Sequence, residues 1–347
     1  MLQINDSGSK TMSDGQRGMN NKVKRWFSKN AVLVFLLAVI VVFSLLNSTF
    51  LTSKNILNLV AQMSINALIA AGMTYVIITA GIDISVGSVA AFAGILSAYL
   101  GLATVDFVSN PFGALAIQLF AALVVGVVCG LFNGIMITKF RVVPMIATLA
   151  MMSIARGFAY VVTDGKPVYG LPDSFAWLGS GRVITTESMP QGVIPIIVIF
   201  TLIVVLSVHL LLTKTVFGRH VFAVGSNEKV ARLAGINVAK VKIKSYILCS
   251  VMAGLAGVCV TSKLNNGQPA SCEGYEMYAI AATVLGGTSF EGGVGSVARA
   301  MIGVAIIAII NNGLNLVQVS SYWQKVVTGA IILLAIIVDM SQKRVKN

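Results

Sequence analysis

Few residues of this chain have side chains that could do chemistry, and the clearest are amides inside long apolar stretches. Gln62 and Asn66 are four residues apart, so they share one face of a helix, and Asn311 and Asn312 belong to a second group. A polar side chain in lipid must find a partner or line a wet path. These amides therefore predict either hydrogen bonds between helices or a polar pathway for a solute.

An aspartate also stands between two apolar stretches, in the segment Gly81–Ser88. Asp83 is placed to cap the helix that follows, with help from Ser85, or alternatively to act with Ser85 in a gate. Arg156 poses a related choice, because it lies about two turns inside an apolar stretch. We expect its side chain to extend outward to the membrane surface, with pairing inside a pathway as the alternative.

Catalytic and metal-binding patterns are missing from the sequence. The glycine-rich segment Leu285–Gly295 is not followed by Gly-Lys-Ser/Thr, so it is a poor phosphate loop and better suits a broken helix or a re-entrant turn. There is no H-E-x-x-H, the four cysteines form no C-x-x-C pair, and we expect no relay of acids inside the apolar stretches. The prediction is a chain with no catalytic residue, no metal site and no cofactor of its own.

One polar, charged segment interrupts the apolar ones, at Val224–Ile236. Ser226 or Asn227 can cap a short helix there, Glu228 suits its first turn, and Gly235 suits a left-handed end. The helix has an apolar face, yet one of about two turns is not stable alone. It is therefore either a solvated connector or a surface on which a partner docks.

Composition places the chain in a membrane. It has 347 residues, of which 56% are hydrophobic and 11% charged, and its mean hydropathy is +0.88. Soluble domains carry about 25% charged residues. The net charge of +13 does not indicate nucleic-acid binding, because the basic residues cluster between apolar stretches. We predict an all-α polytopic membrane protein.

About ten transmembrane helices are expected, since each needs about 20 apolar residues. They are predicted near 31–51, 56–80, 86–105, 113–138, 143–162, 193–213, 245–262, 277–290, 294–316 and 321–340. This places both termini on one side, together with 18 of the 25 Lys and Arg residues, against five on the other. By the positive-inside rule, both tails (1–30 and 341–347) and the 214–244 loop are cytoplasmic, and 31–340 is one transmembrane domain.

The chain resembles the sugar permeases of bacterial ABC importers, of the ribose permease type, from about Leu46 to its end. The resemblance is carried by Gly81–Ser88, Leu285–Gly295, Asn311–Leu316 and the charged segment, where the family usually has Gly-Gly-Asn-Glu and this chain has Gly225-Ser226-Asn227-Glu228. It implies a vitamin B12-importer-like (type II-like) permease fold. It also implies that the charged segment is a coupling helix that fits a cleft on a separate ATPase subunit.

The same resemblance implies the partners. They are an ABC ATPase subunit that holds ATP and Mg²⁺, a periplasmic sugar-binding protein, a second permease copy and the lipid of the bacterial inner membrane. The coupling residues would be Asn227, Glu228, Ala231, Arg232 and Gly235. The expected function is import of a monosaccharide, such as a ribose-like pentose. The alternatives are a furanosyl signalling molecule or nucleoside as solute, or a stand-alone secondary carrier.

Overall fold

The computed structural model describes residues 31–184 and 193–344, and this part of the chain is almost entirely helical. Seven of its helices are long and apolar enough to cross a membrane: α3 (Ser53–Ile78), α4 (Val86–Ala103), α6 (Pro111–Thr138), α7 (Pro144–Thr163), α9 (Ile196–Lys214), α12 (Val238–Leu264) and α14 (Val297–Leu316). A shorter apolar helix, α2 (Ala31–Leu46), precedes them, and α15 (Ser321–Arg344) follows. The predicted class, an all-α polytopic membrane protein, is confirmed.

The remaining elements are short and lie in the connections. They are α5 (Val105–Val108), η1 (Asp173–Ala176), α8 (Trp177–Ser180), β1 (Arg182–Val183), β2 (Ile194–Pro195), α10 (Val216–Ser226), α11 (Glu228–Leu233) and α13 (Tyr275–Leu285). The two strands pair antiparallel, with Arg182 opposite Pro195.

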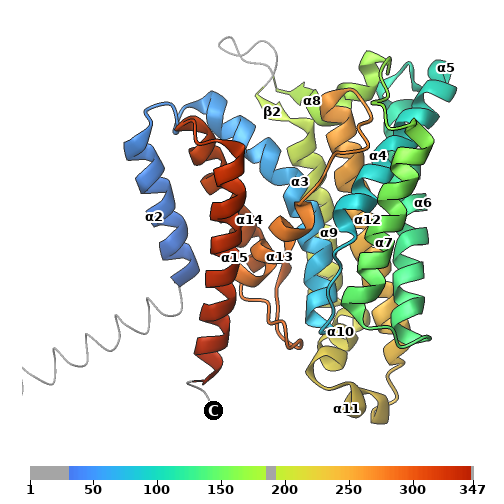
Figure 1. Ribbon diagram of the computed structural model, residues 1–347, viewed down its shortest axis with the longest axis vertical. Coiled ribbons are helices and arrows are strands. Elements are labelled where there is room, and N and C mark those ends of the chain that lie inside the picture. The colour runs from blue at the N-terminus through green and yellow to red at the C-terminus, as the bar shows by residue number, and fades with distance from the viewer. Residues whose placement is uncertain (1–30, 185–192, 345–347) are drawn as a thin grey trace, which may run out of the picture.

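The long helices from α3 to α12 alternate in direction, and α14 runs parallel to α12 because the chain returns between them through α13, as Figure 1 shows. The first turn of α2 and the last turns of α15 therefore end on the same side of the molecule, and α10 and α11 protrude from that side too. This arrangement agrees with the even number of crossings expected from the sequence.

The eighth expected crossing is broken. Its helix, α13, has only 11 residues, which at about 1.5 Å per residue is roughly 16 Å. A membrane core is about 30 Å thick. From the end of α12 the chain descends through the irregular segment 265–274 to α13 at mid-height, and the glycine-rich loop 286–296 continues it to the side of α10 (Figure 1). The suggestion of a broken helix near Leu285–Gly295 is thus borne out.

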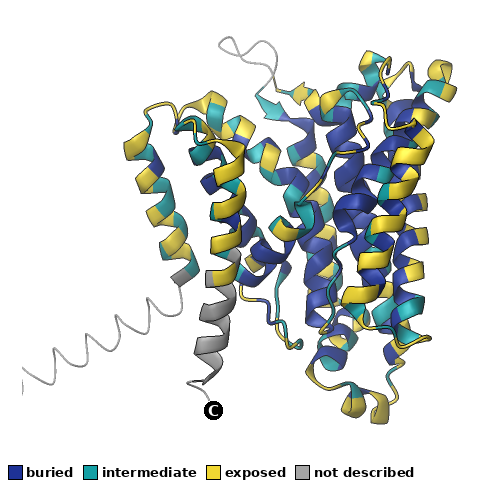
Figure 2. Cartoon of the chain, viewed as in Figure 1, coloured by how far each residue is buried: buried dark blue, intermediate teal, exposed yellow. Residues whose placement is uncertain are grey.

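Helix α12 forms the centre of the bundle, and α3, α4 and α6 pack around it (Figure 2). Of an apolar 18-residue stretch of α12, 78% is buried. Glycines allow the closest of these approaches. A Cβ at Gly130 of α6 would lie 2.5 Å from the Cα of Ile247, and one at Gly134 would lie 2.8 Å from the Cα of Ile243. Small residues let helix backbones touch in this way. In the outer helix α7, by contrast, only 28% of the corresponding apolar stretch is buried.

The charged loop 214–244 contains more helix than the sequence-based expectation gave it. Helix α12 begins at Val238 and not near 245, because Asn237 caps it by accepting a hydrogen bond from Lys240 N at 3.0 Å. Three lysines in its first two turns carry the helix below its apolar part, which hydropathy alone cannot detect. The expected single short helix is also preceded by a second one, α10.

The predicted tails are only partly described. Residues 1–30 and 345–347 lie outside the described residues. Positions 341–344, predicted as tail, continue α15.

Candidate functional site

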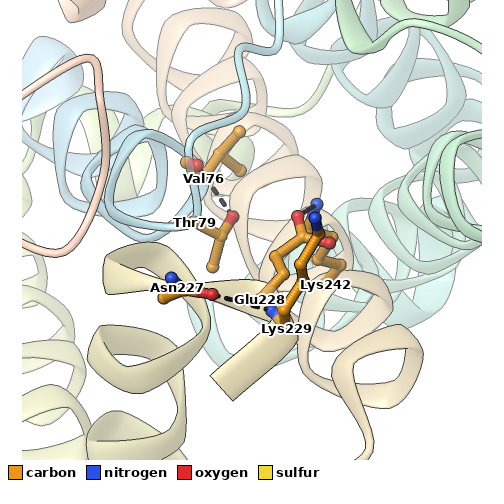
Figure 3. A network of polar contacts seen from close by, with 6 residues as sticks. All are labelled: Val76, Thr79, Asn227, Glu228, Lys229 and Lys242. Atoms are coloured by element: carbon orange, nitrogen blue, oxygen red, sulfur yellow. Dashed lines mark hydrogen bonds and ion pairs between the residues drawn. The ribbon is translucent and has the colours of Figure 1, made fainter. Parts of the chain in front are cut away.

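The protruding helix α11 has the predicted N-terminal cap. The Asn227 side chain accepts hydrogen bonds from Lys229 N at 3.0 Å and from Val230 N at 3.1 Å. These two amides would otherwise have no partner inside the helix. Asn227, and not Ser226, is therefore the cap, and it forms a sharp joint between α10 and α11 (Figure 3).

The predicted left-handed end is present as well. Gly235 has φ +80°, its N–H donates to Arg232 O at 3.1 Å, and Ile236 N donates to Ala231 O at 3.0 Å. This pair of bonds is a Schellman motif, which satisfies the last carbonyl groups of a helix. A six-residue helix with both ends capped holds a defined shape, although its length alone would not stabilise it.

The apolar face of α11 points away from the rest of the chain. Leu233 is 89% exposed and Val230 is 60% exposed, whereas Ala231 is buried at 3%. Ala231 thus attaches the helix to the body, and the larger apolar side chains are left open on the side that protrudes. Arg232 and Lys229 are exposed beside them.

An ion pair holds α11 at a fixed angle to α12. Glu228, at the start of α11, contacts the amino group of Lys242 on α12, as Figure 3 shows. The Lys242 side chain is 17% exposed, so water screens this pair less than it screens an ordinary surface pair. Beneath it, Lys244 lies over the ring of Phe217 on α10, 5.9 Å from the centroid.

Three backbones meet where α10 ends. Gly293 N, in the loop before α14, donates a hydrogen bond to Ile78 O at the end of α3, at 2.9 Å. Gly225 packs on the same carbonyl so closely that a Cβ there would lie 1.7 Å from it. The end of α10, the end of α3 and the loop before α14 therefore touch through main-chain atoms.

Asp83 and Ser85, expected at a gate, are fully buried in a network that includes Asn133 of α6. Asp83 Oδ1 accepts hydrogen bonds from Ser85 N at 2.9 Å and from Ser85 Oγ at 2.5 Å. Asn133 Nδ2 donates to Ser85 Oγ at 3.1 Å. Asp83 Oδ2 and Asn133 Oδ1 have no hydrogen-bond partner among the described residues. The network ties the turn before α4 to α6. Asp83 does not cap α4, contrary to the sequence-based expectation, because Ser85 holds the N-cap position without a side-chain capping bond and Asp83 bonds to Ser85 itself.

The four amides are not brought together. Asn312 Nδ2 donates to Asn55 Oδ1, and Asn55 Nδ2 donates back to Asn312 Oδ1, both at 2.9 Å. This reciprocal pair joins α14 to α3 and matches the expected bonding between helices. Gln62 is exposed, and Asn66 and Asn311 are partly buried. For these three amides, a position along a polar pathway remains a prediction.

Arg156 does not extend outward, contrary to the sequence-based expectation. Its Nη1 donates to Pro269 O at 2.6 Å and to Ser271 O at 2.8 Å. The irregular segment 265–274 leaves these carbonyls without helical partners, and the guanidinium satisfies them. No sequence signal pointed to this contact, because it joins residues more than 100 positions apart.

The fold and the site together define a multi-pass membrane protein with a broken crossing and a capped helix that protrudes on one side. The family described as "Branched-chain amino acid transport system / permease component" matches residues 55–336, so the chain belongs to this family of transport permeases.

Relatives of known name support the same assignment. The chain is 43% identical to the ribose import permease protein RbsC of Escherichia coli K12 over 91% of this chain and 95% of that one. It is 40% identical to the D-allose transport system permease protein AlsC of the same strain, over 88% and 90%. It is 34% identical to the L-arabinose transport system permease protein AraH of that strain, over 93% and 94%. No solved structure matches the chain. The resemblance to ribose-type permeases is confirmed.

Proposed function

We propose that this chain is the membrane-spanning permease of an ABC importer for a monosaccharide, and that a separate ATPase subunit drives it through α11. Three relatives aligned over about nine-tenths of the chain carry ribose, allose and arabinose in their names. The family description names branched-chain amino acids, so leucine belongs in any test of the solute. Ribose-like sugars are the first choice, and a nucleoside or a furanosyl signalling molecule is the alternative.

The observation that carries the proposal is the open apolar face of α11. Full burial of a leucine or valine side chain is worth about 1.5–3 kcal/mol, and Leu233 leaves most of this unrealised at 89% exposure. Helix α11 protrudes beyond the membrane-crossing helices, so the hydrocarbon of the membrane does not cover its apolar face. In our proposal, a cleft on the ATPase subunit covers this face instead.

Each predicted coupling residue then has a physical part. Asn227 and Gly235 fix the two ends of α11, Glu228 sets its angle through Lys242, Ala231 seats it, and Arg232 offers a charge to the partner. ATP binding by the ATPase, with Mg²⁺, would move the helix. The contact of Gly225 with Ile78 O would carry this motion to the bundle.

The remaining parts of the proposal concern topology and partners. The excess of Lys and Arg on the side of α11 favours a cytoplasmic position for both termini in the bacterial inner membrane. A periplasmic sugar-binding protein delivers the solute, and a second permease copy completes the pathway. Nucleic acid is not a partner.

Docking is tested by reversing the character of the open face. The double variant Val230→Asp, Leu233→Asp is co-expressed with the ATPase subunit and purified in detergent. We expect ATPase recovery to fall at least about ten-fold, which corresponds to about 1.4 kcal/mol, with unchanged amounts of permease in the membrane. The matched control is Val216→Asp, which changes another exposed valine at the first position of α10, where a carboxylate is tolerated. Equal recovery for all three proteins would disprove the coupling role.

A further inference from the structure

The broken crossing opens a cavity that none of the sequence motifs indicated. It lies between α7, the start of α4 and the chain that descends to α13, and its volume is about 380 Å³. Sites for small molecules typically span about 300–1,000 Å³. The side chains that give it chemical character are Ser88, Ser153, Arg156, Tyr160, Glu273 and Glu276.

Glu276 is a residue that the sequence analysis did not single out. It lies in the first turn of α13, and α13 lies at mid-height of the bundle (Figure 1). The glutamate was missed because apolar composition placed the start of the crossing at 277. Glu273 stands one turn before it and is exposed in the cavity.

Arg156 shapes the cavity without filling it. Its two hydrogen bonds to Pro269 O and Ser271 O attach the irregular segment 265–274 to α7. Non-helical backbone at membrane depth is tolerated where protein buries it or where it lines a wet cavity. Within the described residues, this guanidinium binds carbonyl groups and forms no ion pair. The carboxylate of Glu276 accepts hydrogen bonds from the backbone N–H groups of Gly274 and of Glu276 itself, and a carboxylate can accept further hydrogen bonds beyond these.

The start of α4 forms the opposite wall. A Cβ at Gly87 would lie 2.4 Å from Glu276 Oε2 and 2.5 Å from Cys272 O, so the glycine lets the carboxylate pack on the first turn of the helix. A helix N-terminus favours a negative charge, which steadies Glu276 there. Ser88, one residue on, is buried and lines the same space.

The chemistry of the lining selects the ligand. Carboxylate oxygens accept hydrogen bonds from hydroxyl groups, and the hydroxyls of Ser153 and Tyr160 both donate and accept. Two carboxylates disfavour a phosphate or another anion. No group of three or more His, Cys, Asp or Glu that could hold a metal occurs among the described residues. The lining suits a neutral solute with many hydroxyl groups.

We propose that this cavity is a binding site for a sugar in transit, in which Glu273 and Glu276 contact the solute hydroxyls, Ser153 lines the wall beside them and Arg156 acts as a positioning residue. The inference rests on the proposed function for the identity of the solute. It adds the place in the membrane where the solute pauses and the groups that hold it there.

Cysteine labelling tests whether the cavity is wet and binds sugar. Ser153→Cys and Ile154→Cys are made in the full chain and treated with a charged maleimide after purification in detergent. Ile154 is 41% exposed but lies outside the cavity, and the four native cysteines are buried. We expect the cysteine at position 153 to react about ten-fold faster, because thiolate formation needs a polar environment. D-ribose, D-allose or L-arabinose should slow its reaction, and glycine betaine at equal concentration should not.

Removal of the Glu276 carboxylate distinguishes a cavity that binds sugar from a cavity that only admits water. In Ser153→Cys, Glu276→Gln, labelling should remain fast, and protection by the sugar should need about ten-fold more sugar. Slow labelling at 153, or protection that is absent or independent of Glu276, overturns the proposal.

Uptake by the complete transporter distinguishes this failure from failure of the proposed function. If uptake of the sugar requires α11 while position 153 shows no protection, the cavity proposal alone is wrong. If the sugar protects position 153 while uptake does not require α11, the coupling proposal is wrong and the cavity proposal stands.

Discussion

Two polar regions of the bundle, one at its centre and one beside the outer helix α7, differ in what surrounds their hydrogen-bonding groups. In the Asp83 network, Ser85 directs both its N–H and its hydroxyl to one carboxylate oxygen, and Asn133 closes the network from α6. In the cavity, Arg156 donates to backbone carbonyl groups and Glu276 accepts from backbone N–H groups, while Glu273 and Ser153 are exposed. The first region joins elements of the fold, and the second is the one that we propose binds a solute.

The difference shows that a polar residue between apolar stretches is not by itself a pathway residue. Asp83 has no exposed surface, so a solute cannot reach it without a rearrangement of α4 and α6. Glu276 lies in a helix that is interrupted, and an interruption is what opens space within a packed bundle.

The largest effect is expected at the glycine between the cavity walls. Gly87→Ala places a methyl group 2.5 Å from Cys272 O, so the descending segment must shift and Glu276 must leave its place. We predict that sugar uptake falls about ten-fold at equal amounts of folded protein. The control is Gly157→Ala on α7, where nothing lies within 4 Å of an added Cβ. Wild-type uptake by the Gly87 variant would show that this wall does not shape the pathway.

A smaller effect, on stability and not on transport, is expected in the buried network. Asp83→Ala leaves the N–H and hydroxyl of Ser85 without their acceptor, at a cost of about 1–3 kcal/mol. Asp83→Asn keeps an acceptor oxygen and should cost less. Thermal unfolding of the purified chain measures the order, and uptake per folded molecule should stay near wild type. If uptake is lost while stability stays at the wild-type value, the hypothesis that Asp83 acts in a gate becomes the better one.

The smallest effect is expected for the pair of amides Asn55 and Asn312, which lies near the start of α3. Asn312→Ala, Asn55→Ala and the double variant form a cycle for the two hydrogen bonds that join α14 to α3. Pairs of this kind in membrane proteins average about 0.6 kcal/mol of coupling. Thermal unfolding of the variants gives the value. A coupling near zero would mean that the two amides are bonded elsewhere, and a solute path along α14 would become the better interpretation.

Local signals in the sequence predicted the ends of α11 because those ends depend on local geometry. A cap needs only a side chain two or three residues from the amides it serves, and a left-handed glycine needs only its own φ. Hydropathy likewise located the long helices, since each needs about 20 apolar residues. The capped ends of α11 and the seven long apolar helices of the described residues follow from these two signals.

Long-range contacts could not be predicted in the same way. Arg156 meets carbonyls 113 and 115 residues away, and no periodicity in the sequence records that distance. Glu276 was missed because a crossing made of an 11-residue helix and two irregular segments has no apolar run of full length. The apolar face of α11 was predicted, but only the fold shows that it points outward.

The central claim is that motion made by a separate ATPase enters this chain through α11. Uptake of labelled D-ribose, D-allose and L-arabinose into proteoliposomes tests it most directly, with a sugar-binding protein present and ATP on the side of the ATPase. We predict ATP-dependent uptake of at least one sugar by the complete assembly and none when the ATPase is omitted or when residues 226–234 are deleted from an otherwise inserted chain. Uptake by this chain alone, or by the deletion variant, would contradict the account.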